Sequence, residues 1–240
     1  MRKKIFIDCG HNYSGADTGS QGNGLREQDV TYKVGKILSE LLKVSGFDVK
    51  MSRENLTDNI GKSENESLHT RAKMANDWKA DCFVSLHCDS TINQLAKGCH
   101  GIIYKEGGQA EKLARSIVDE LYKLNLDGRS ELIEERPKYP VLYATNMTAC
   151  IIEMGFISNP DNAEIMRKTE VLATAIHKGI LKYFNINTQK EIESVNDIVW
   201  ELASRGIITD KALWLKKLEE DKNVYWLCKK TIDYLIKKGV

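Results

Sequence analysis

The sequence predicts an α/β fold, with a mainly parallel, twisted sheet that has helices on both faces, followed by a small all-α C-terminal module. Three observations support this fold class. Short β-branched, apolar runs alternate with helical patterns of about ten or more residues, which is the order of βαβ units. Three of these runs end at a residue that can bind a metal or carry a proton. No strand-like run follows residue 188.

The elements of the first part follow in a regular order. The apolar residues 5–7 predict the first strand, and a glycine-rich loop runs from Gly10 to Gly24. Apolar residues at helical spacing predict a helix over residues 26–45, with Gly46 as its C-terminal stop. The next predicted elements are a strand over 47–51, a loop over 53–66, a helix over 67–78 capped by Ser67, strands over 82–86 and 101–104, and a helix over 109–124.

The end of the first part contains one region without a clear pattern, residues 127–143. Residues 149–152 are apolar and predict a strand. Asn159 followed by Pro160 is typical of an N-cap and a first helical residue, so a helix is expected to begin there. A last helix over residues 171–184 closes the predicted domain.

A polar stretch over residues 185–191 marks a boundary, and we predict two domains, residues 1–187 and 188–240. So small a helical unit rarely buries enough apolar surface to be stable alone. We therefore expect it to pack on another surface, and one expectation is a homo-oligomer formed through these helices. The module is predicted to hold helices over 192–203, 210–220 (capped by Thr209 or Asp210) and 223–238.

Composition argues against several classes of partner. The formal net charge is +1 at pH 7 and charges of both signs are mixed, so neither nucleic acid nor an anionic membrane is indicated. The N-terminal apolar run stops at Asp8, short of the roughly 7–15 residues of a signal peptide or about 20 of a membrane span. The six cysteines form no CxxC pair and are expected to be reduced and buried. We expect synthesis in the cytoplasm and no membrane insertion.

Four residues at predicted element ends indicate metal-assisted chemistry. His11 follows the first strand, Glu27 opens the first helix and His87 ends the third strand. Because the carboxyl ends of parallel strands meet at one edge of a sheet, the three are expected to converge. Two imidazoles and a carboxylate form a ligand set of catalytic zinc, with a fourth position open for water. Glu153 ends a neighbouring strand and is the candidate acid and base.

Each of these residues has a simpler explanation when taken alone. His11 can be a loop histidine bonded to a backbone carbonyl, Glu27 a helix N-terminal acid, and His87 a structural residue. Their joint position favours the metal site. The nucleophile alternatives are weak, because Cys88 and its neighbour His87 point to opposite faces of a strand and Ser85 has no Gly-x-Ser-x-Gly elbow. His69 and His177 fall on predicted helices and are expected to be surface or core residues. His100 is expected in a loop between glycines, where a structural role is favoured and a substrate contact is the alternative.

Five strings together resemble the zinc-dependent N-acetylmuramoyl-L-alanine amidases over residues 3–184. They are Asp8-Cys9-Gly10-His11, Gly24-Leu25-Arg26-Glu27, Arg71-Ala72-Lys73-Met74-Ala75-Asn76, Phe83-Val84-Ser85-Leu86-His87-Cys88-Asp89 and Ile152-Glu153-Met154-Gly155-Phe156-Ile157-Ser158-Asn159. The resemblance implies Zn²⁺ as cofactor, His11, Glu27 and His87 as ligands, and Glu153 as catalytic acid/base. The implied reaction cleaves the amide between N-acetylmuramic acid and L-alanine in the peptidoglycan of a Gram-positive cell wall.

The resemblance has limits at particular positions. Asn12-Tyr13 stands where family members commonly have a second glycine, and residues 137–146 are less similar. Asp8 and Arg71 match recurrent family positions, and we expect only supporting roles for them.

The expected biology follows from the whole chain. The C-terminal module resembles small modules of phage and clostridial lytic enzymes, so cell-wall binding is expected, with self-association or packing on the catalytic domain as the alternative. A phage endolysin that acts on the wall after release fits a chain without an export signal. A mother-cell autolysin, a zinc peptidase acting on cell-wall peptides and a non-catalytic wall-binding protein are the alternatives.

Overall fold

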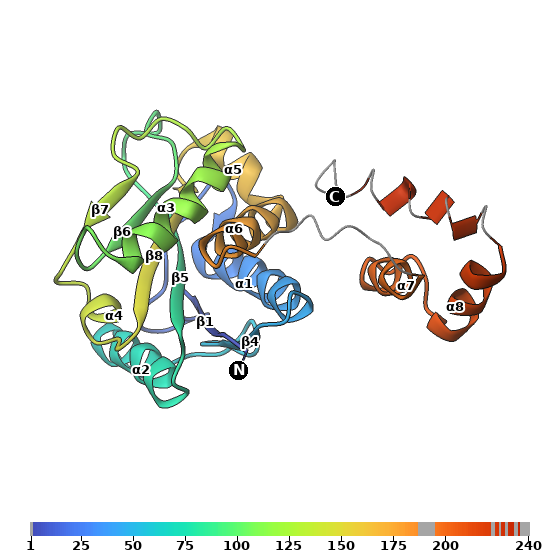
Figure 1. Ribbon diagram of the computed structural model, residues 1–240. Helices are drawn as coiled ribbons and strands as arrows, with labels where there is room; N and C mark the ends of the chain where they lie inside the picture. The colour runs from blue at the N-terminus through green and yellow to red at the C-terminus, as the bar shows by residue number, and fades with distance from the viewer. Residues whose placement is uncertain are drawn as a thin grey trace. The chain divides into compact units, whose positions relative to one another are not determined.

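The chain forms two compact units, Met1–Ile186 and Asn187–Val240, each described by itself (Figure 1). The computed structural model describes residues 2–186, 195–221, 224–225, 227–228, 230–232 and 235. The predicted boundary stretch over 185–191 therefore lies mostly outside the described residues.

The first unit is built on a six-stranded sheet with the strand order β4-β1-β5-β8-β6-β7. The four strands from β4 to β8 are parallel, β6 runs antiparallel to β8, and β7 is parallel to β6. The mainly parallel sheet is thus confirmed. Its strands are β1 (Lys4–Cys9), β4 (Asp48–Met51), β5 (Cys82–Asp89), β6 (His100–Ile103), β7 (Ile133–Glu135) and β8 (Thr148–Phe156).

Helices cover both faces of this sheet, as predicted (Figure 1). Strand β1 shows the cause: Ile5 and Ile7 belong to the larger apolar core, and Phe6 between them belongs to a second core on the opposite face. The larger core is covered by α1 (Glu27–Val44), α3 (Gln109–Tyr122), α5 (Pro160–Met166) and α6 (Thr169–Tyr183), and the second by α2 (Glu64–Asp77) and α4 (Pro140–Tyr143).

The predicted start of the second helix was wrong. Helix α2 begins at Glu64, and the N-cap is Ser63, whose side chain accepts a hydrogen bond from the backbone N–H of Glu66 at 3.2 Å. Ser67, the predicted cap, lies inside α2, and its buried hydroxyl donates to Oδ2 of Asp17 at 2.6 Å. The first turn of α2 is polar, so it shows no apolar helical pattern in the sequence. Glu64 and Glu66 lie there near the positive end of the helix dipole.

Other local differences concern short elements. The glycine-rich loop contains a small hairpin of β2 (Gln21–Gly22) and β3 (Leu25–Arg26), and the region without a clear pattern contains β7 and α4. By contrast, the predicted cap Asn159 is confirmed, because its side chain accepts from the backbone N–H of Asn162 at 3.0 Å. Elements of two to four residues are too short to give a periodic pattern.

The second unit contains α7 (Val195–Ser204) and α8 (Lys211–Glu220), followed by helical residues between 224 and 235. Asp210 caps α8 by accepting from the backbone N–H of Leu213 at 3.0 Å, one of the two caps expected. Residues 192–194 and parts of the expected helix over 223–238 lie outside the described residues. The second unit has a small apolar core of its own, made of Ile198, Val199, Leu202, Ile208, Leu218 and Ile232.

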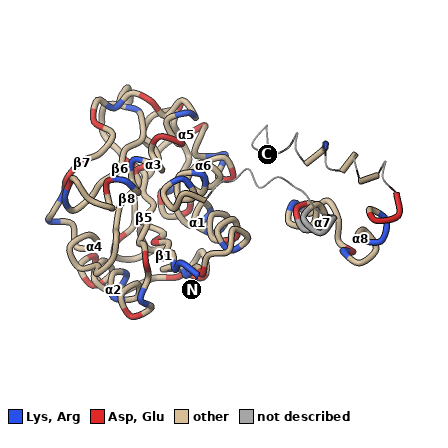
Figure 2. The backbone as a smooth tube through the Cα atoms, in the orientation of Figure 1, with Lys and Arg blue, Asp and Glu red and all other residues tan. Residues whose placement is uncertain are grey.

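The distribution of charged residues and cysteines can be compared with the sequence-based expectations. Basic and acidic positions are interspersed along the backbone of the first unit (Figure 2). The six cysteines are free, and five of them are buried. Among the described residues, every helix is too short or too polar to cross a membrane.

Candidate metal centre

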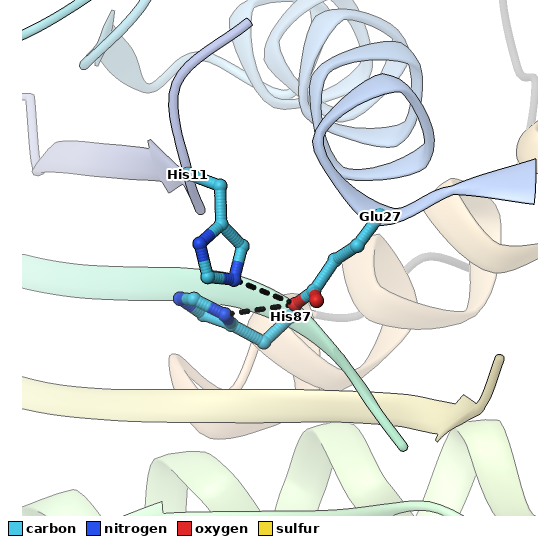
Figure 3. A group of neighbouring side chains, drawn as sticks. All are labelled: His11, Glu27 and His87. Atoms are coloured by element: carbon cyan, nitrogen blue, oxygen red, sulfur yellow. Dashed lines mark hydrogen bonds and ion pairs between the residues drawn. The ribbon is translucent and has the colours of Figure 1, made fainter. Parts of the chain in front are cut away.

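The three residues expected to bind metal converge at one edge of the sheet (Figure 3). His11 follows β1, Glu27 is the first residue of α1, and His87 lies near the end of β5. Nε2 of His11 lies 3.1 Å and Nδ1 of His87 lies 3.0 Å from the same oxygen, Oε1 of Glu27. One ligand atom from each residue lies within 4.8 Å of the others, which is compact enough to hold one metal ion.

Two glycines leave room for these side chains. A Cβ on Gly10 would lie 2.5 Å from Nε2 of His87. A Cβ on Gly19 would lie 2.7 Å from Cδ2 of His11 and 2.8 Å from Oε2 of Glu27. Real Cβ atoms do not approach neighbours this closely, so the glycine-rich loop packs against the ligands only because these positions lack side chains.

Glu27 is held as a buried carboxylate. Its Oε1 accepts from the backbone N–H of Cys88 and its Oε2 from that of Ser20, both at 2.9 Å. Burial alone would raise its pKa, but the hydrogen bonds and charges of His11 and His87 outweigh burial and place the pKa of Glu27 far below its usual range. Glu27 therefore presents a negatively charged oxygen to the two imidazoles.

His11 is oriented by a carboxylate that the sequence analysis missed. Its Nδ1 lies 2.9 Å from Oδ1 of Asp17, which leaves Nε2 directed toward Glu27. Burial disfavours the charged imidazole, but the hydrogen bonds to Asp17 and Glu27 outweigh burial and raise the pKa of His11 to about 9. A carboxylate behind a ligating histidine is a common feature of metal sites, because it fixes the ring and its tautomer.

Asp17 is itself held by a buried network. Its Oδ2 accepts from the hydroxyl of Ser67 at 2.6 Å and from the guanidinium of Arg71. Arg71 also lies 3.2 Å from Oδ2 of Asp8, which accepts from the hydroxyl of Ser85 at 2.7 Å. Arg71 thus contacts Asp17, the group behind His11, directly, and Asp8 contacts it only through Arg71. Nothing in the glycine-rich loop distinguished Asp17 from other loop aspartates.

We expect Asp17→Asn to weaken zinc binding roughly 10- to 100-fold, the usual effect of losing a residue that orients a metal ligand. An amide holds His11 less firmly than a carboxylate does. Competition with a chelating dye measures the affinity, and Asp77→Asn is the control because that side chain is 64% exposed on α2. Equal zinc affinity in Asp17→Asn and the control would contradict the role of Asp17.

Glu153 lies beside the three residues on the adjacent strand. It is opposite His87 of β5 on one side and opposite His100 of β6 on the other. Its Oε2 is buried and has no hydrogen-bond partner in the part of the chain that the structure describes. Burial, followed by repulsion from Glu27 and Asp89, raises the pKa of Glu153 well above its usual range. Glu153 can therefore hold a proton next to the candidate metal site.

A cleft of about 250 Å³ opens next to Glu153. Besides Glu153, it is lined by Asp89, His100, Ile102, Arg129, Glu134, Arg136 and Tyr139. The prediction that His100 lies in a loop was wrong: it begins β6 and is buried. Because β6 is antiparallel to β8, its first residue reaches the edge where β8 carries Glu153. Burial, with Arg129 nearby, lowers the pKa of His100 to about 4, so its ring is neutral at neutral pH.

The remaining candidates have other partners. His69 is near Tyr143 on the surface, and His177 of α6 lies 2.8 Å from the Ser45 hydroxyl. Burial raises the pKa of the Cys88 thiol well above its usual range, which disfavours the reactive thiolate. His69 and His177 thus have side-chain partners outside the three converging residues, and the Cys88 thiol is disfavoured as a nucleophile.

Asn12, which departs from the usual family glycine, has a structural explanation. Its side chain is buried, donates to the backbone carbonyls of Ala16 at 2.9 Å and Ile60 at 3.1 Å, and accepts from the N–H of Ile60 at 2.7 Å. Asn12 therefore fastens the loop that carries His11 to the loop before α2.

Comparisons with known proteins agree with this geometry. A family profile described as N-acetylmuramoyl-L-alanine amidase matches residues 5–182. The germination-specific N-acetylmuramoyl-L-alanine amidase of Bacillus subtilis (strain 168) is 31% identical over 192 residues, 76% of this chain and 80% of its own length. The endolysin of Bacillus phage SPP1 is 30% identical over 196 residues, 78% and 68% of the two chains. The CwlD amidase from Clostridioides difficile, solved in complex with the GerS lipoprotein, has a TM-score of 0.70 at 26% identity and covers 78% of this chain and 100% of its own.

Proposed function

The chain belongs to the N-acetylmuramoyl-L-alanine amidase family and has its cell-wall amidase activity, and from this premise we propose that it works as a zinc enzyme. In this proposal His11, Glu27 and His87 hold the metal, and Glu153 is the acid and base. The observation that carries it is the convergence of two imidazole nitrogens and one carboxylate oxygen beside a protonatable carboxyl group. This donor set fits catalytic zinc, which takes three protein ligands.

The mechanism assigns each residue a task. Zinc, when bound, would supply the Lewis acid that polarises the amide carbonyl and the attacking water. Asp17 keeps the His11 ring directed toward the site. Glu153 takes the proton of the attacking water and passes it to the amide nitrogen, so that L-alanine leaves with a free amino group. The raised pKa of Glu153 suits the second transfer, in which the group holds the proton and delivers it to the nitrogen. The first transfer requires the ionised carboxylate, which a cation held by His11, Glu27 and His87 would favour.

A digest of purified Gram-positive peptidoglycan tests the proposed bond and the metal together. New amino termini on alanine, without new reducing sugars, are expected, and a chelator should remove this activity until zinc is added back. New amino termini on other residues would instead favour the zinc peptidase. A zinc-loaded protein that releases neither product from any wall would favour the wall-binding protein.

For the second unit we propose cell-wall binding. The family match ends at residue 182, so the catalytic similarity does not extend into these helices, and they have a core of their own. Removing residues 187–240 is expected to weaken binding to whole walls in a sedimentation assay. Hydrolysis of a short soluble muropeptide should persist, because the first unit has its own core. Unchanged sedimentation would favour self-association or packing on the catalytic unit instead.

For the biological role we propose a phage endolysin that reaches the wall after release from the cytoplasm, with a mother-cell autolysin as the alternative. The similarity to the endolysin of Bacillus phage SPP1 supports the first, and the similarity to a germination-specific amidase favours a role in the spore cycle. Following the protein after prophage induction and during sporulation in its host separates the two, because an endolysin accumulates only late in the phage cycle.

A further inference from the structure

The cleft begins at Glu153 and continues on the side of His100. Glu153 lies between His87, on the side of the metal ligands, and His100, on the side of the cleft. In the proposed reaction Glu153 must reach the leaving amide nitrogen within hydrogen-bond distance. A peptide that departs with this nitrogen and extends past Glu153, away from His87, enters the cleft. This step rests on the proposed function.

The acidic groups of the cleft are already occupied. Asp89 accepts from the backbone N–H of Ser90 at 2.9 Å through Oδ1 and from Arg129 at 3.2 Å through Oδ2. Glu134 pairs with Arg136 through Oε1, and its Oε2 lies 3.5 Å from Nε2 of His100 and 3.8 Å from Arg129. Both carboxylates have both oxygens engaged, so they offer little to an additional cation.

The basic groups have donors to spare. A guanidinium carries five N–H donors, whereas the interactions of Arg136 in the cleft engage one nitrogen and those of Arg129 engage two. Arg136 is also the more accessible, with 51% of its side chain exposed against 27% for Arg129. The unused hydrogen-bonding capacity of the cleft is thus on the donor side, which favours an anionic ligand with planar oxygens.

We propose that this cleft is a specificity subsite that binds a carboxylate of the leaving peptide, on the residue that follows L-alanine, through Arg136 with Arg129 behind it. One peptide residue spans about 3.3–3.6 Å, so the residue after alanine is the first whose carboxylate can extend past Glu153 into the cleft. The chemical class of the ligand is an acidic peptide. A peptide with a carboxamide in place of this carboxylate loses its partner in the cleft.

Two matched soluble substrates test the subsite: muropeptides that differ only in a free carboxylate or a carboxamide on the second peptide residue. The unchanged protein should have a kcat/KM about 10- to 100-fold higher for the carboxylate, the effect expected of a hydrogen bond to a charged group. Arg136→Gln should bring this ratio close to one, mainly through KM, and Arg136→Lys should restore part of it. Arg115→Gln, on α3 away from the cleft, is the control and should leave the ratio unchanged.

The outcomes separate the subsite from the proposed function. Equal kcat/KM values for both substrates in the unchanged protein would overturn the subsite while leaving the amidase mechanism intact. A ratio that Arg136→Gln leaves unchanged would overturn the role of Arg136. Hydrolysis of neither substrate by the zinc-loaded protein would overturn the subsite and the proposed function together. Equal zinc content and melting temperature in the variants show that the substitutions act locally.

Discussion

Glu153→Gln is expected to lower the rate of amide hydrolysis by roughly 10²- to 10⁴-fold, the usual contribution of a general acid and base. Glutamine keeps the size and polarity of the side chain but cannot accept and return a proton. Zinc binding should persist, because Glu153 is not one of the three converging ligands. Rates on a soluble muropeptide and zinc content after dialysis measure the two effects.

The matched control is Glu164→Gln on α5, whose carboxylate is 70% exposed. The metal-free Glu153→Gln protein should also melt no lower than the unchanged protein at pH 8. The pKa of Glu153 is raised in the folded state, so its ionised form reduces stability as the pH rises above the value of an unfolded glutamate, and glutamine removes this effect. An active Glu153→Gln protein would contradict the catalytic assignment.

His87→Ala should lose both zinc and activity. Only His11 and Glu27 would remain to hold the metal, so the fall in zinc affinity should exceed the roughly 10- to 100-fold expected for Asp17, which only orients a ligand. Zinc content after dialysis against a weak chelator and hydrolysis of peptidoglycan measure the two losses. His69→Ala is the control, because that histidine lies on the surface of α2. A zinc-loaded His87→Ala protein would show that the metal lies elsewhere.

The position of the candidate site could be predicted from the sequence because topology alone places it. In a parallel sheet the carboxyl ends of the strands share one edge, so apolar runs ending near His11, His87 and Glu153 brought these residues together without any knowledge of loops. The strands extend further than predicted, to Asp89 and Phe156, and the pairing of β5 with β8 includes His87 opposite Glu153. The apolar pattern stops at the first polar residue, so it does not show that a strand continues beyond that residue.

The surroundings of the site were not predictable in the same way. Asp17 contacts His11 across a loop whose path depends on the positive φ of 68° at His11 and on Asn12, which local sequence patterns do not reveal. His100 reaches Glu153 only because β6 runs antiparallel to β8, and its short apolar run gives no sign of direction. The cleft and its two arginines follow from the same unexpected strand direction.

The most direct test of the zinc mechanism is a titration of the metal-free protein with zinc, in which bound zinc and the release of alanine amino termini from peptidoglycan are measured on the same samples. The proposed mechanism predicts that activity rises in proportion to bound zinc and stops rising at one zinc per chain. Full activity before zinc is added, or a protein with one bound zinc and no amidase activity, would contradict it.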